Sequence, residues 1–585
     1  MTNSLATRIL GFTAILAVAT PLAAQKVPDD LDRFVQVQMT QRRIPGLSLA
    51  ILQDGRIIEA RAYGVTDRGR NEAVQSTTLF QAGSISKSVA ALGALHLVEQ
   101  QKLSLDTDVN ASLTTWKLPA SEFTATKPVT LRALLSHTAG LTVHGFPGYA
   151  VDAPLPTLVQ VLNGTSPANT GSIRNDAVPG TRWNYSGGGY TIMQQMMIDV
   201  THQSFPDYMQ RTVLTPLGMT HSSYEQPLPP TMARTTAAGH YPNGHAVKGR
   251  WHLYPEMAAA GLWTTPSDLL WFANEIQRSV VGKSNRVISQ SLTREMLTDQ
   301  KDRDGLGVFL EDQGAALRFG HNGRDEGFDA LLSATVESGQ GVAIMINAND
   351  NSAAVSRIRD FIAKKYHWPS SQSAYVAPIA VAVTPAELDA VAGRYEMNPN
   401  NMAAFIVDHG RLFISSDGMP AEEFIPIGHD KFASADHDAR FSLVRDTLNA
   451  VTGFTWTTSN DSRMVPRIGP LFAALAAKPD LDPALTARIE VALRALGKGG
   501  DALTDAVGFT EGARKDFRNA CVPAAGMRSI AFVTEENVGT RNIERHGGRV
   551  ERIRYYRMTT EEGQLKLMVH LTSEGLVTDV DIVDE

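Results

Sequence analysis

The sequence predicts a first domain of the α/β (α+β) class with a central antiparallel sheet and an inserted helical subdomain, followed by a small all-β module and an α+β module. Strand patterns occur near both ends of the first domain, with helical patterns between them. After a break rich in proline and serine, short strand patterns recur, and the last segment combines a helix with strands. The length of 585 residues is enough for two to four domains.

The first domain is expected at residues 28–367. It begins with a hairpin at residues 45–63, where two apolar runs flank the turn Gln53-Asp54-Gly55. Residues 84–101 predict a largely buried helix, because the segment is rich in large apolar residues and its Gly, Ala and Ser residues leave room for close packing. The other expected elements are a helix at 189–200, a second helix ending near Pro216, and strands between 317 and 347. Strands from both ends of the domain are therefore expected to be neighbours in one sheet.

A linker at residues 368–384 is expected to separate the first domain from two further modules. Residues 385–468 predict a small β module of barrel-like character, since short strands recur and a hairpin turns at residues 408–410. Residues 470–585 predict an α+β module. Its expected elements are a helix at 483–496 and strands at 550–558, 565–571 and 577–583.

Residues 1–24 have the pattern of a secretory signal peptide. Arg8 precedes a short apolar run at residues 9–18, and small residues follow as far as Ala24, where cleavage is expected. The run is shorter than the roughly 20 apolar residues of a membrane-spanning helix, although an uncleaved anchor is the alternative. The protein is therefore expected to be exported, either periplasmic or secreted, without a membrane span after cleavage.

The amino-acid composition of the chain argues against several classes of partner and cofactor. The net charge is −7 and no run of Lys or Arg occurs, so no nucleic-acid partner is expected. Cys521 is the only cysteine, which excludes an intramolecular disulfide and a multi-cysteine metal site. There is no metal-spaced His/Glu cluster and no phosphate-binding glycine loop, so neither a metal nor an organic cofactor is expected. The oligomeric state is left open.

Ser84 and Lys87 are the first residues that indicate a catalytic function. They lie in Phe80-Gln-Ala-Gly-Ser84-Ile-Ser-Lys87 at the start of the expected helix. Residues three apart share a helix face, so the amine can reach the hydroxyl. A serine hydroxyl needs a base to become a nucleophile, and lysine can be that base only if burial or a nearby positive charge lowers its pKa. Taken alone, the pair is more often only a solvated helix start.

Two groups of residues later in the sequence favour a catalytic pair over a solvated helix start. Tyr185 stands beside the glycines at residues 187–189, just before a helix, which places a phenol on an exposed turn where it could pass a proton. His321 precedes Gly323 and Arg324 on an expected strand, and a glycine there would let a ligand approach the backbone closely. Separately, the tyrosine is more often a core residue and the histidine a turn residue.

In this order and spacing, the three groups resemble the serine β-lactamases and penicillin-binding proteins, most closely the class C-like branch with its family VIII esterases, D-aminopeptidases and DD-peptidases. The resemblance covers roughly residues 30–365 and implies a β-lactamase-like fold for this domain. Further family-like segments are Ile44-Pro-Gly-Leu-Ser48, Thr130-Leu-Arg-Ala-Leu-Leu-Ser-His-Thr-Ala-Gly-Leu141, Leu214-Thr-Pro-Leu-Gly-Met219, Ala259-Ala-Gly-Leu262 and Thr265-Pro-Ser-Asp268.

The resemblance implies a role for each residue. Ser84 is expected to be the acylated nucleophile and Lys87 its base. Tyr185 is expected to pass a proton to the leaving group. The backbone N–H groups of Ser84 and Arg324 are expected to form the oxyanion hole, beside His321 and Gly323 at the substrate cleft.

Two departures from the family pattern bear on the substrate. Gly187 stands where relatives often have asparagine, so a side-chain amide is missing unless Asn184 replaces it. His321 stands where true β-lactamases have a lysine that helps to bind the carboxylate of a β-lactam. A histidine is mostly neutral at pH 7, and it is expected to gain charge as the pH falls toward 6. His-x-Gly is the form found in the esterase and D-aminopeptidase relatives.

The sequence thus predicts a serine hydrolase that acts through an acyl-enzyme on small esters or on D-amino-acid amides and peptides. The expected partner is such a small-molecule ester, amide or peptide. The alternatives are a class C-like β-lactamase, a penicillin-binding or sensing protein that deacylates slowly, and a non-catalytic scaffold. The intact Ser84, Lys87 and Tyr185 argue against the scaffold.

Overall fold

The computed structural model describes residues 29–369 and 379–582, with short gaps. The gaps are residues 71, 242–243, 350, 399–400, 409, 417–418, 435–438, 459–461, 499–507, 511–512, 514–526, 540–543, 546–547 and 561–563. The expected signal peptide, most of the expected linker, and Cys521 lie outside the described residues, so export stays a prediction. No helix in the described ranges is both long enough and apolar enough to cross a membrane.

A seven-stranded antiparallel sheet forms the centre of the first domain, in the order β3-β2-β1-β11-β10-β9-β8. The expected hairpin is β1 (Gly46–Gln53) and β2 (Arg56–Asp67), and β1 also pairs with β11 (Gly341–Ile346). Strands from both ends of the domain are therefore neighbours, as predicted. The other strands of the sheet are β3 (Glu72–Ala73), β8 (Phe309–Glu311), β9 (Arg318–Asp325) and β10 (Phe328–Thr335).

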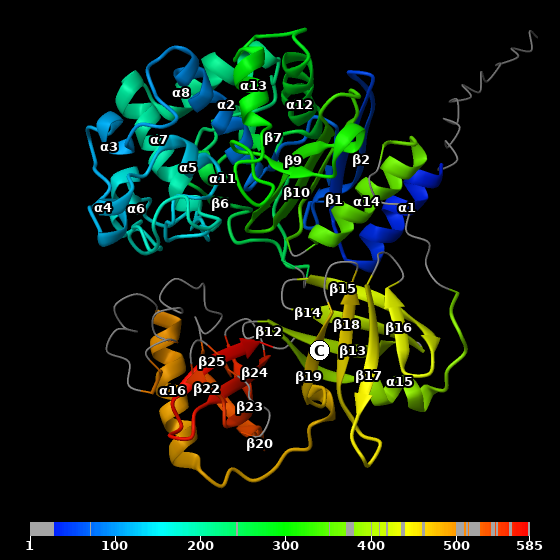
Figure 1. The fold of residues 1–585 in the computed structure, drawn as a ribbon. Helices are drawn as coiled ribbons and strands as arrows, with labels where there is room; N and C mark the ends of the chain where they lie inside the picture. The colour runs from blue at the N-terminus through cyan, green and yellow to red at the C-terminus, as the bar shows by residue number, and fades with distance from the viewer. Residues whose placement is uncertain are drawn as a thin grey trace, which may run out of the picture.

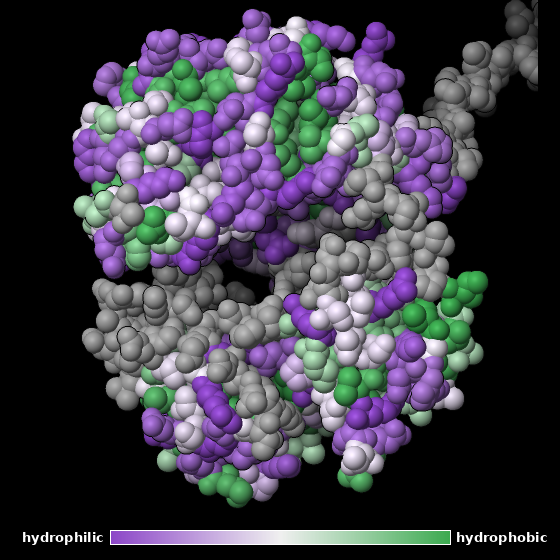
Figure 2. Space-filling view, in the orientation of Figure 1, coloured by the Kyte–Doolittle hydropathy of each residue, from purple (hydrophilic) through white to green (hydrophobic). Residues whose placement is uncertain are grey.

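Helices cover both faces of this sheet (Figure 1). Alternate residues of a strand point to opposite faces, so Leu49 and Ile344 face one helical layer while Ala50 and Met345 face the other. The first layer consists of α1 (Asp30–Gln41) and α14 (Ser352–Lys365), and the second contains α2 (Ile85–Glu99) and α12 (Pro266–Val280). The outer surface in this orientation is largely polar, with apolar side chains near α12 and α13 (Gln290–Met296) (Figure 2).

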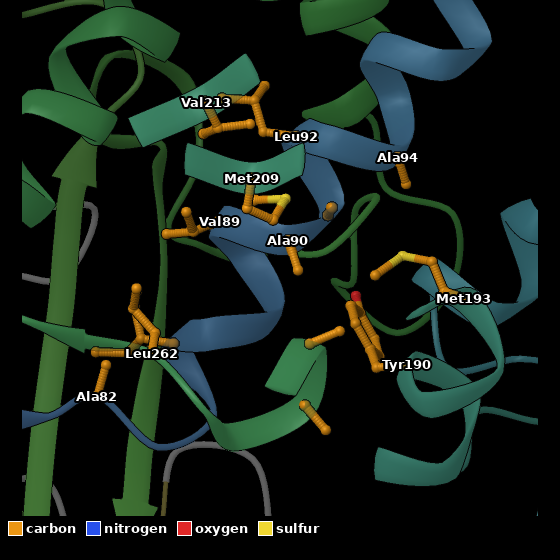
Figure 3. Close-up of a cluster of buried hydrophobic side chains, with 14 of the residues drawn as sticks. Ala82, Val89, Ala90, Leu92, Ala94, Tyr190, Met193, Met209, Val213 and Leu262 are labelled. Carbon is orange, nitrogen blue, oxygen red and sulfur yellow. The ribbon is translucent and has the colours of Figure 1, made fainter. Parts of the chain in front are cut away.

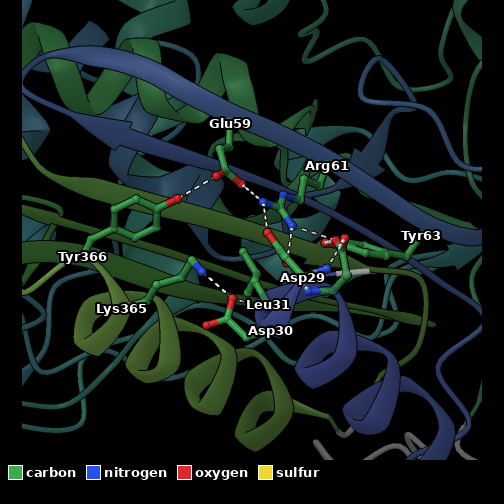
Figure 4. Close-up of polar contacts among 9 residues, drawn as sticks. Asp29, Asp30, Leu31, Glu59, Arg61, Tyr63, Lys365 and Tyr366 are labelled. Carbon is green, nitrogen blue, oxygen red and sulfur yellow. Dashed lines mark hydrogen bonds and ion pairs between the residues drawn. The ribbon is translucent and has the colours of Figure 1, made fainter. Parts of the chain in front are cut away.

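A polar network ties α1 and the end of α14 to β2 (Figure 4). Arg61 of β2 donates to Asp29 at 2.9 Å and to Asp32 at 2.7 Å, at the beginning of α1. Arg61 also forms an ion pair with Glu59 at 2.5 Å, and Tyr366 donates to the same carboxylate at 2.6 Å. The hydrogen bonds from Arg61 hold the pKa of Asp29 well below its usual range. The network therefore fixes both helices to one strand.

The inserted helical part surrounds α2, which is buried along almost its whole length (Figure 3). The expected helix at 189–200 is α7 (Gly187–Thr201). The next helix runs from Phe205 to Leu217 through α8 (Phe205–Met209), a π-helical turn (Gln210–Leu214) and α9 (Thr215–Leu217). Shorter elements complete this part: α3 (Val109–Ser112), α4 (Glu122–Thr126), α5 (Leu131–Leu135), α6 (Leu158–Asn163), α10 (Pro230–Ala233), α11 (Met257–Ala260), β4 (Phe80–Gln81), β5 (Tyr149–Ala150), β6 (His252–Leu253) and β7 (Trp263–Thr264).

Eight consecutive strands close into a barrel in the order β12 to β19. Helix α15 (Pro385–Val391) precedes them, so the prediction that this module contains only strands was wrong at its beginning. The local signal for that helix is clear, because Thr384 and Glu387 form a capping box around Pro385. The strands are β12 (Gly393–Asn398), β13 (Asn401–Asp408), β14 (Arg411–Ser416), β15 (Met419–Gly428), β16 (Lys431–Ser434), β17 (Ala439–Arg445), β18 (Val451–Thr458) and β19 (Ser462–Gly469).

The last segment contains α16 (Pro483–Lys498) and a four-stranded sheet in the order β20-β23-β24-β25. Buried Arg394 of β12 joins the barrel to this sheet. Its guanidinium donates to the Pro470 carbonyl at 2.7 Å and to the Tyr555 hydroxyl at 3.0 Å. The barrel and the sheet therefore pack against each other. The strands are β20 (Ser529–Asn537), β21 (Glu544–Arg545), β22 (Gly548–Arg549), β23 (Arg552–Thr559), β24 (Gln564–Leu571) and β25 (Val577–Ile582).

Candidate active site

Ser84 and Lys87 meet at the beginning of α2, as the sequence predicts. Ser84 is the N-cap residue, but its hydroxyl makes no capping hydrogen bond with the helix. Lys87 Nζ lies 2.9 Å from Ser84 Oγ. Ser84 is partly exposed, whereas Lys87 is only 2% exposed. The buried amine of Lys87 thus contacts the hydroxyl of Ser84, which is a partly exposed residue.

Burial sets the protonation of Lys87. Desolvation lowers the pKa of its amine from 10.5 to about 7, while the charge of Asp325 acts in the opposite direction. The amine also donates to the Ala259 carbonyl of α11 at 2.8 Å, which fixes its position. Near neutral pH, a substantial fraction of Lys87 is therefore unprotonated and able to accept a proton from Ser84.

Tyr185 completes the group at the end of the turn before α7. Ser84 is close enough to its hydroxyl to lower its pKa, and Lys87 Nζ lies 5.0 Å from the centre of its ring. The ring is partly buried rather than on an exposed turn, so that part of the prediction was wrong. The reason is that the imidazole of His137 lies against it, with ring centres 4.2 Å apart. Burial raises the pKa of Tyr185, and the nearby Ser84 lowers it.

Strand β9 lies directly against the residues before α2. A Cβ on Gly323 would lie 1.8 Å from the Ala82 carbonyl oxygen and 3.2 Å from the backbone nitrogen of Ser84. A Cβ on Gly83 would lie 2.3 Å from the backbone nitrogen of Arg324. Gly323 therefore admits the protein's own backbone, and not a ligand as the sequence suggested. The contact brings the backbones of Ser84 and Arg324 side by side.

The side chain of Arg324 points away from this group. Its guanidinium bonds to Asp329 at 2.8 Å and to Ser352 at 2.9 Å, toward α14. Only the backbone of Arg324 is left at the site, so the role expected for its N–H in the oxyanion hole stays a prediction.

His321 of β9 is 5% exposed, and its ring lies near the ring of Tyr185. Its ring stacks on Phe309, with ring centres 4.3 Å apart, and its Nδ1 lies 2.5 Å from the Asn322 carbonyl oxygen. Burial and then the charge of Lys87 lower the pKa of His321 to about 3. The expectation that it gains charge as the pH falls toward 6 was therefore wrong. Its Nε2 has no hydrogen-bond partner within the described residues.

Phe146 and the His144 backbone lie close to Gly187, the position where relatives often have asparagine. A Cβ on Gly187 would lie 2.9 Å from the Phe146 ring and 3.3 Å from the His144 carbonyl oxygen, so a larger side chain there would have to displace that ring. The backbone N–H of Asn184 donates to the His137 carbonyl at 2.7 Å. Lys87 donates its second hydrogen bond to the Ala259 carbonyl, not to a side-chain amide.

Two buried residues at the site were not singled out in the sequence. Asp325 ends β9 and is 4% exposed, and the backbone N–H of Gly83 and the hydroxyl of Tyr254 are close enough to its carboxylate to lower its pKa. Burial raises its pKa, and the ammonium of Lys87 opposes this. The alternation of a strand places Asp325 on the face of Gly323, which was a usable signal. The other residue is His137, within the family-like segment 130–141. No group of three or more His, Cys, Asp or Glu in the described ranges could hold a metal ion.

Matches to known proteins cover between about half and three quarters of this chain. Protein flp from Staphylococcus aureus (strain N315) is 23% identical over an alignment of 336 residues that covers 54% of this chain and 63% of that relative. This chain therefore spans less than two thirds of that relative's length. Penicillin-binding protein 4 from Amycolatopsis lactamdurans is 28% identical over an alignment of 332 residues that covers 53% of this chain and 82% of the relative.

The octameric penicillin-binding protein homologue from Pyrococcus abyssi has a similar fold, with a TM-score of 0.51 and 20% sequence identity. That match covers 74% of this chain and 99% of the homologue. A protein-family model described as Beta-lactamase matches residues 31–366. The match spans more than half of the chain and includes every segment that holds Ser84, Lys87, Tyr185 and His321, so this chain belongs to the Beta-lactamase family.

Proposed function

We propose that this protein is a serine hydrolase that turns over small esters, or D-amino-acid amides and peptides, through an acyl-enzyme on Ser84. The observation that carries the proposal is the 2.9 Å contact between Lys87 Nζ and Ser84 Oγ. It is made by a buried amine whose pKa is lowered to about 7, so a base stands next to the nucleophile at neutral pH.

Each proton has a defined path in this mechanism. As Ser84 Oγ attacks the carbonyl carbon, its proton passes to the neutral amine of Lys87. The backbone N–H groups of Ser84 and Arg324 stabilise the oxyanion. Tyr185 then gives a proton to the leaving group and is reprotonated from Lys87. Attack of water on the acyl carbonyl, with its proton taken by the same pair, releases the acid and restores Ser84.

The environment of His321 supports uncharged substrates. The residue carries no charge near neutral pH, because burial lowers its pKa to about 3. It therefore presents no positive charge where a β-lactamase would have a lysine ammonium. A second candidate function is that of a penicillin-binding protein with slow deacylation, which the similarity to Penicillin-binding protein 4 favours.

A comparison of two chromogenic substrates tests the preference. We expect kcat/KM for p-nitrophenyl butyrate to exceed that for nitrocefin by roughly 10–150-fold, because one charge-assisted hydrogen bond of about 1.5–3 kcal/mol is missing for the β-lactam carboxylate. The ratio is expected to stay constant down to mildly acidic pH, since His321 gains charge only near its pKa of about 3. The His321→Lys variant should move the ratio toward nitrocefin. A higher kcat/KM for nitrocefin in the wild type, with rapid turnover, would instead support a β-lactamase.

The rate of acylation should depend on pH through Lys87. Its neutral amine is the active form, and the lowered pKa means that this form accumulates above about pH 7. We therefore expect kcat/KM to fall about tenfold per pH unit below that value and to level off above it. In Asp325→Asn, which lacks the charge that raises the pKa of Lys87, the acid limb should move to lower pH. An acid limb near the ordinary lysine pKa of 10.5 would contradict the role of Lys87 as base.

A further inference from the structure

His137 contacts the chain on both sides of Tyr185. Its carbonyl oxygen accepts a hydrogen bond from the N–H of Asn184 at 2.7 Å. Its ring nitrogen Nδ1 accepts one from the N–H of Ser186 at 3.1 Å. The imidazole also lies against the phenol of Tyr185, with ring centres 4.2 Å apart and an angle of 39° between the planes. One residue therefore holds the backbone before and after the tyrosine and also supports its ring.

His137 is itself held in an unusual conformation. It lies just after α5, is 3% exposed, and has a φ of 54°, in the left-handed region. Residues other than glycine seldom adopt this region, and they persist there when the surrounding structure determines the backbone. The position of the imidazole relative to Tyr185 is therefore set by the fold.

Only the neutral imidazole can make these contacts. The N–H of Ser186 is a donor, so Nδ1 must carry no proton and the ring proton must be on Nε2. Burial, and then the charges of Lys87 and His321, hold the pKa of His137 well below its usual value of 6.5. His137 thus stays a hydrogen-bond acceptor over the whole range in which Lys87 titrates.

Ser186 extends the support to α7. Its hydroxyl accepts from the N–H of Gly189 at 3.1 Å, which caps the helix, and donates to the Thr142 carbonyl at 3.1 Å. The peptide after Tyr185 is therefore fixed to the helix on one side and to His137 on the other. Loss of the imidazole would release the tyrosine while leaving the helix cap in place.

We propose that His137 is a positioning residue for Tyr185, which as a neutral hydrogen-bond acceptor holds the phenol at the hydroxyl of Ser84 and near the amine of Lys87. His137 does not need to touch the substrate for this. The inference rests on the proposed function, because it requires that Tyr185 transfers protons at this site.

Two substitutions at residue 137 test the acceptor. His137→Asn keeps an acceptor oxygen near the position of Nδ1, and asparagine tolerates the left-handed region. His137→Leu keeps the apolar volume and removes the acceptor. We expect His137→Leu to lower kcat for p-nitrophenyl butyrate about 10²-fold with little change in KM, as for a misplacement of about 1 Å. His137→Asn should restore kcat to within about tenfold of the wild type.

The matched control is His96→Leu. His96 lies on the last turn of the same helix that begins beside Ser84, and its ring bonds to the Val287 carbonyl at 2.6 Å. This variant also loses an imidazole from the first domain, and its kcat should equal that of the wild type. Thermal unfolding of all variants separates loss of activity from loss of fold.

A double-mutant cycle with Tyr185→Phe separates positioning from a general structural role. If His137 acts through the phenol, His137→Leu should lower kcat no more than about threefold further once the hydroxyl is absent. The full 10²-fold drop in the Tyr185→Phe background, or wild-type kcat in His137→Leu alone, would overturn the inference. Wild-type kcat in Tyr185→Phe would contradict the proposed function itself, so the two failures are distinguishable.

Discussion

The Ser84→Ala variant is expected to lose covalent labelling by a fluorophosphonate or a labelled penicillin and to lose hydrolysis by about 10⁴-fold or more. Removal of a nucleophile that acts together with its base has an effect of this size in serine hydrolases. The fold should persist, because the hydroxyl of Ser84 makes no helix-capping bond. Labelling followed by gel fluorescence and mass spectrometry of the modified peptide measures the result.

Ser88→Ala is the matched control for that experiment. Ser88 lies one turn further along α2, and its buried hydroxyl has no hydrogen-bond partner in the described part of the chain. Its removal should leave labelling and hydrolysis unchanged. Undiminished labelling of Ser84→Ala at another residue would remove Ser84 as the nucleophile.

The Gly323→Ala variant is expected to lower kcat/KM by about 10²–10³-fold although every proposed catalytic side chain remains. The added Cβ would lie 1.8 Å from the Ala82 carbonyl oxygen, so the backbone that carries Ser84 must move away from β9. The two N–H groups proposed for the oxyanion hole then separate, and the loss of one such donor has a cost of this size. Single-turnover kinetics with a p-nitrophenyl ester would place the defect in acylation.

Gly428→Ala in the barrel is the control for adding a methyl group. There the nearest atom to the added Cβ would be 3.9 Å away, an ordinary contact, so kcat/KM should not change. A melting temperature close to that of the wild type in Gly323→Ala would exclude unfolding as the cause. Wild-type kcat/KM in that variant would mean that β9 and Ser84 do not form the oxyanion hole together.

Local sequence patterns were sufficient to predict contacts between site residues that lie on the same helix or strand. The spacing of Ser84 and Lys87 predicts their contact, because a helix brings residues three apart to one face. The glycine at 323 also predicts a close backbone approach. What approaches is the segment before α2, far away in the sequence, and no local pattern could reveal that.

Properties that depend on burial were not predictable in the same way. The pKa of His321 falls because Phe309 covers its ring and Lys87 lies nearby, and both neighbours come from other elements. The role that we infer for His137 likewise depends on two hydrogen bonds across about 50 positions of the chain. In contrast, α15 was missed although its capping box was visible in the sequence.

The order of strands in the first sheet determines how this chain can fold. In its central pair, Leu47 of β1 lies opposite Ile346 of β11, so the ends of the domain must meet before the sheet can form. Contacts between such distant positions close slowly, and apolar strands stay uncovered until they do. The barrel differs, because every strand pair except the closing one, β12 with β19, joins neighbours along the chain. Most of the barrel can therefore form from local hairpins, while the first sheet must wait until β11 has been synthesised.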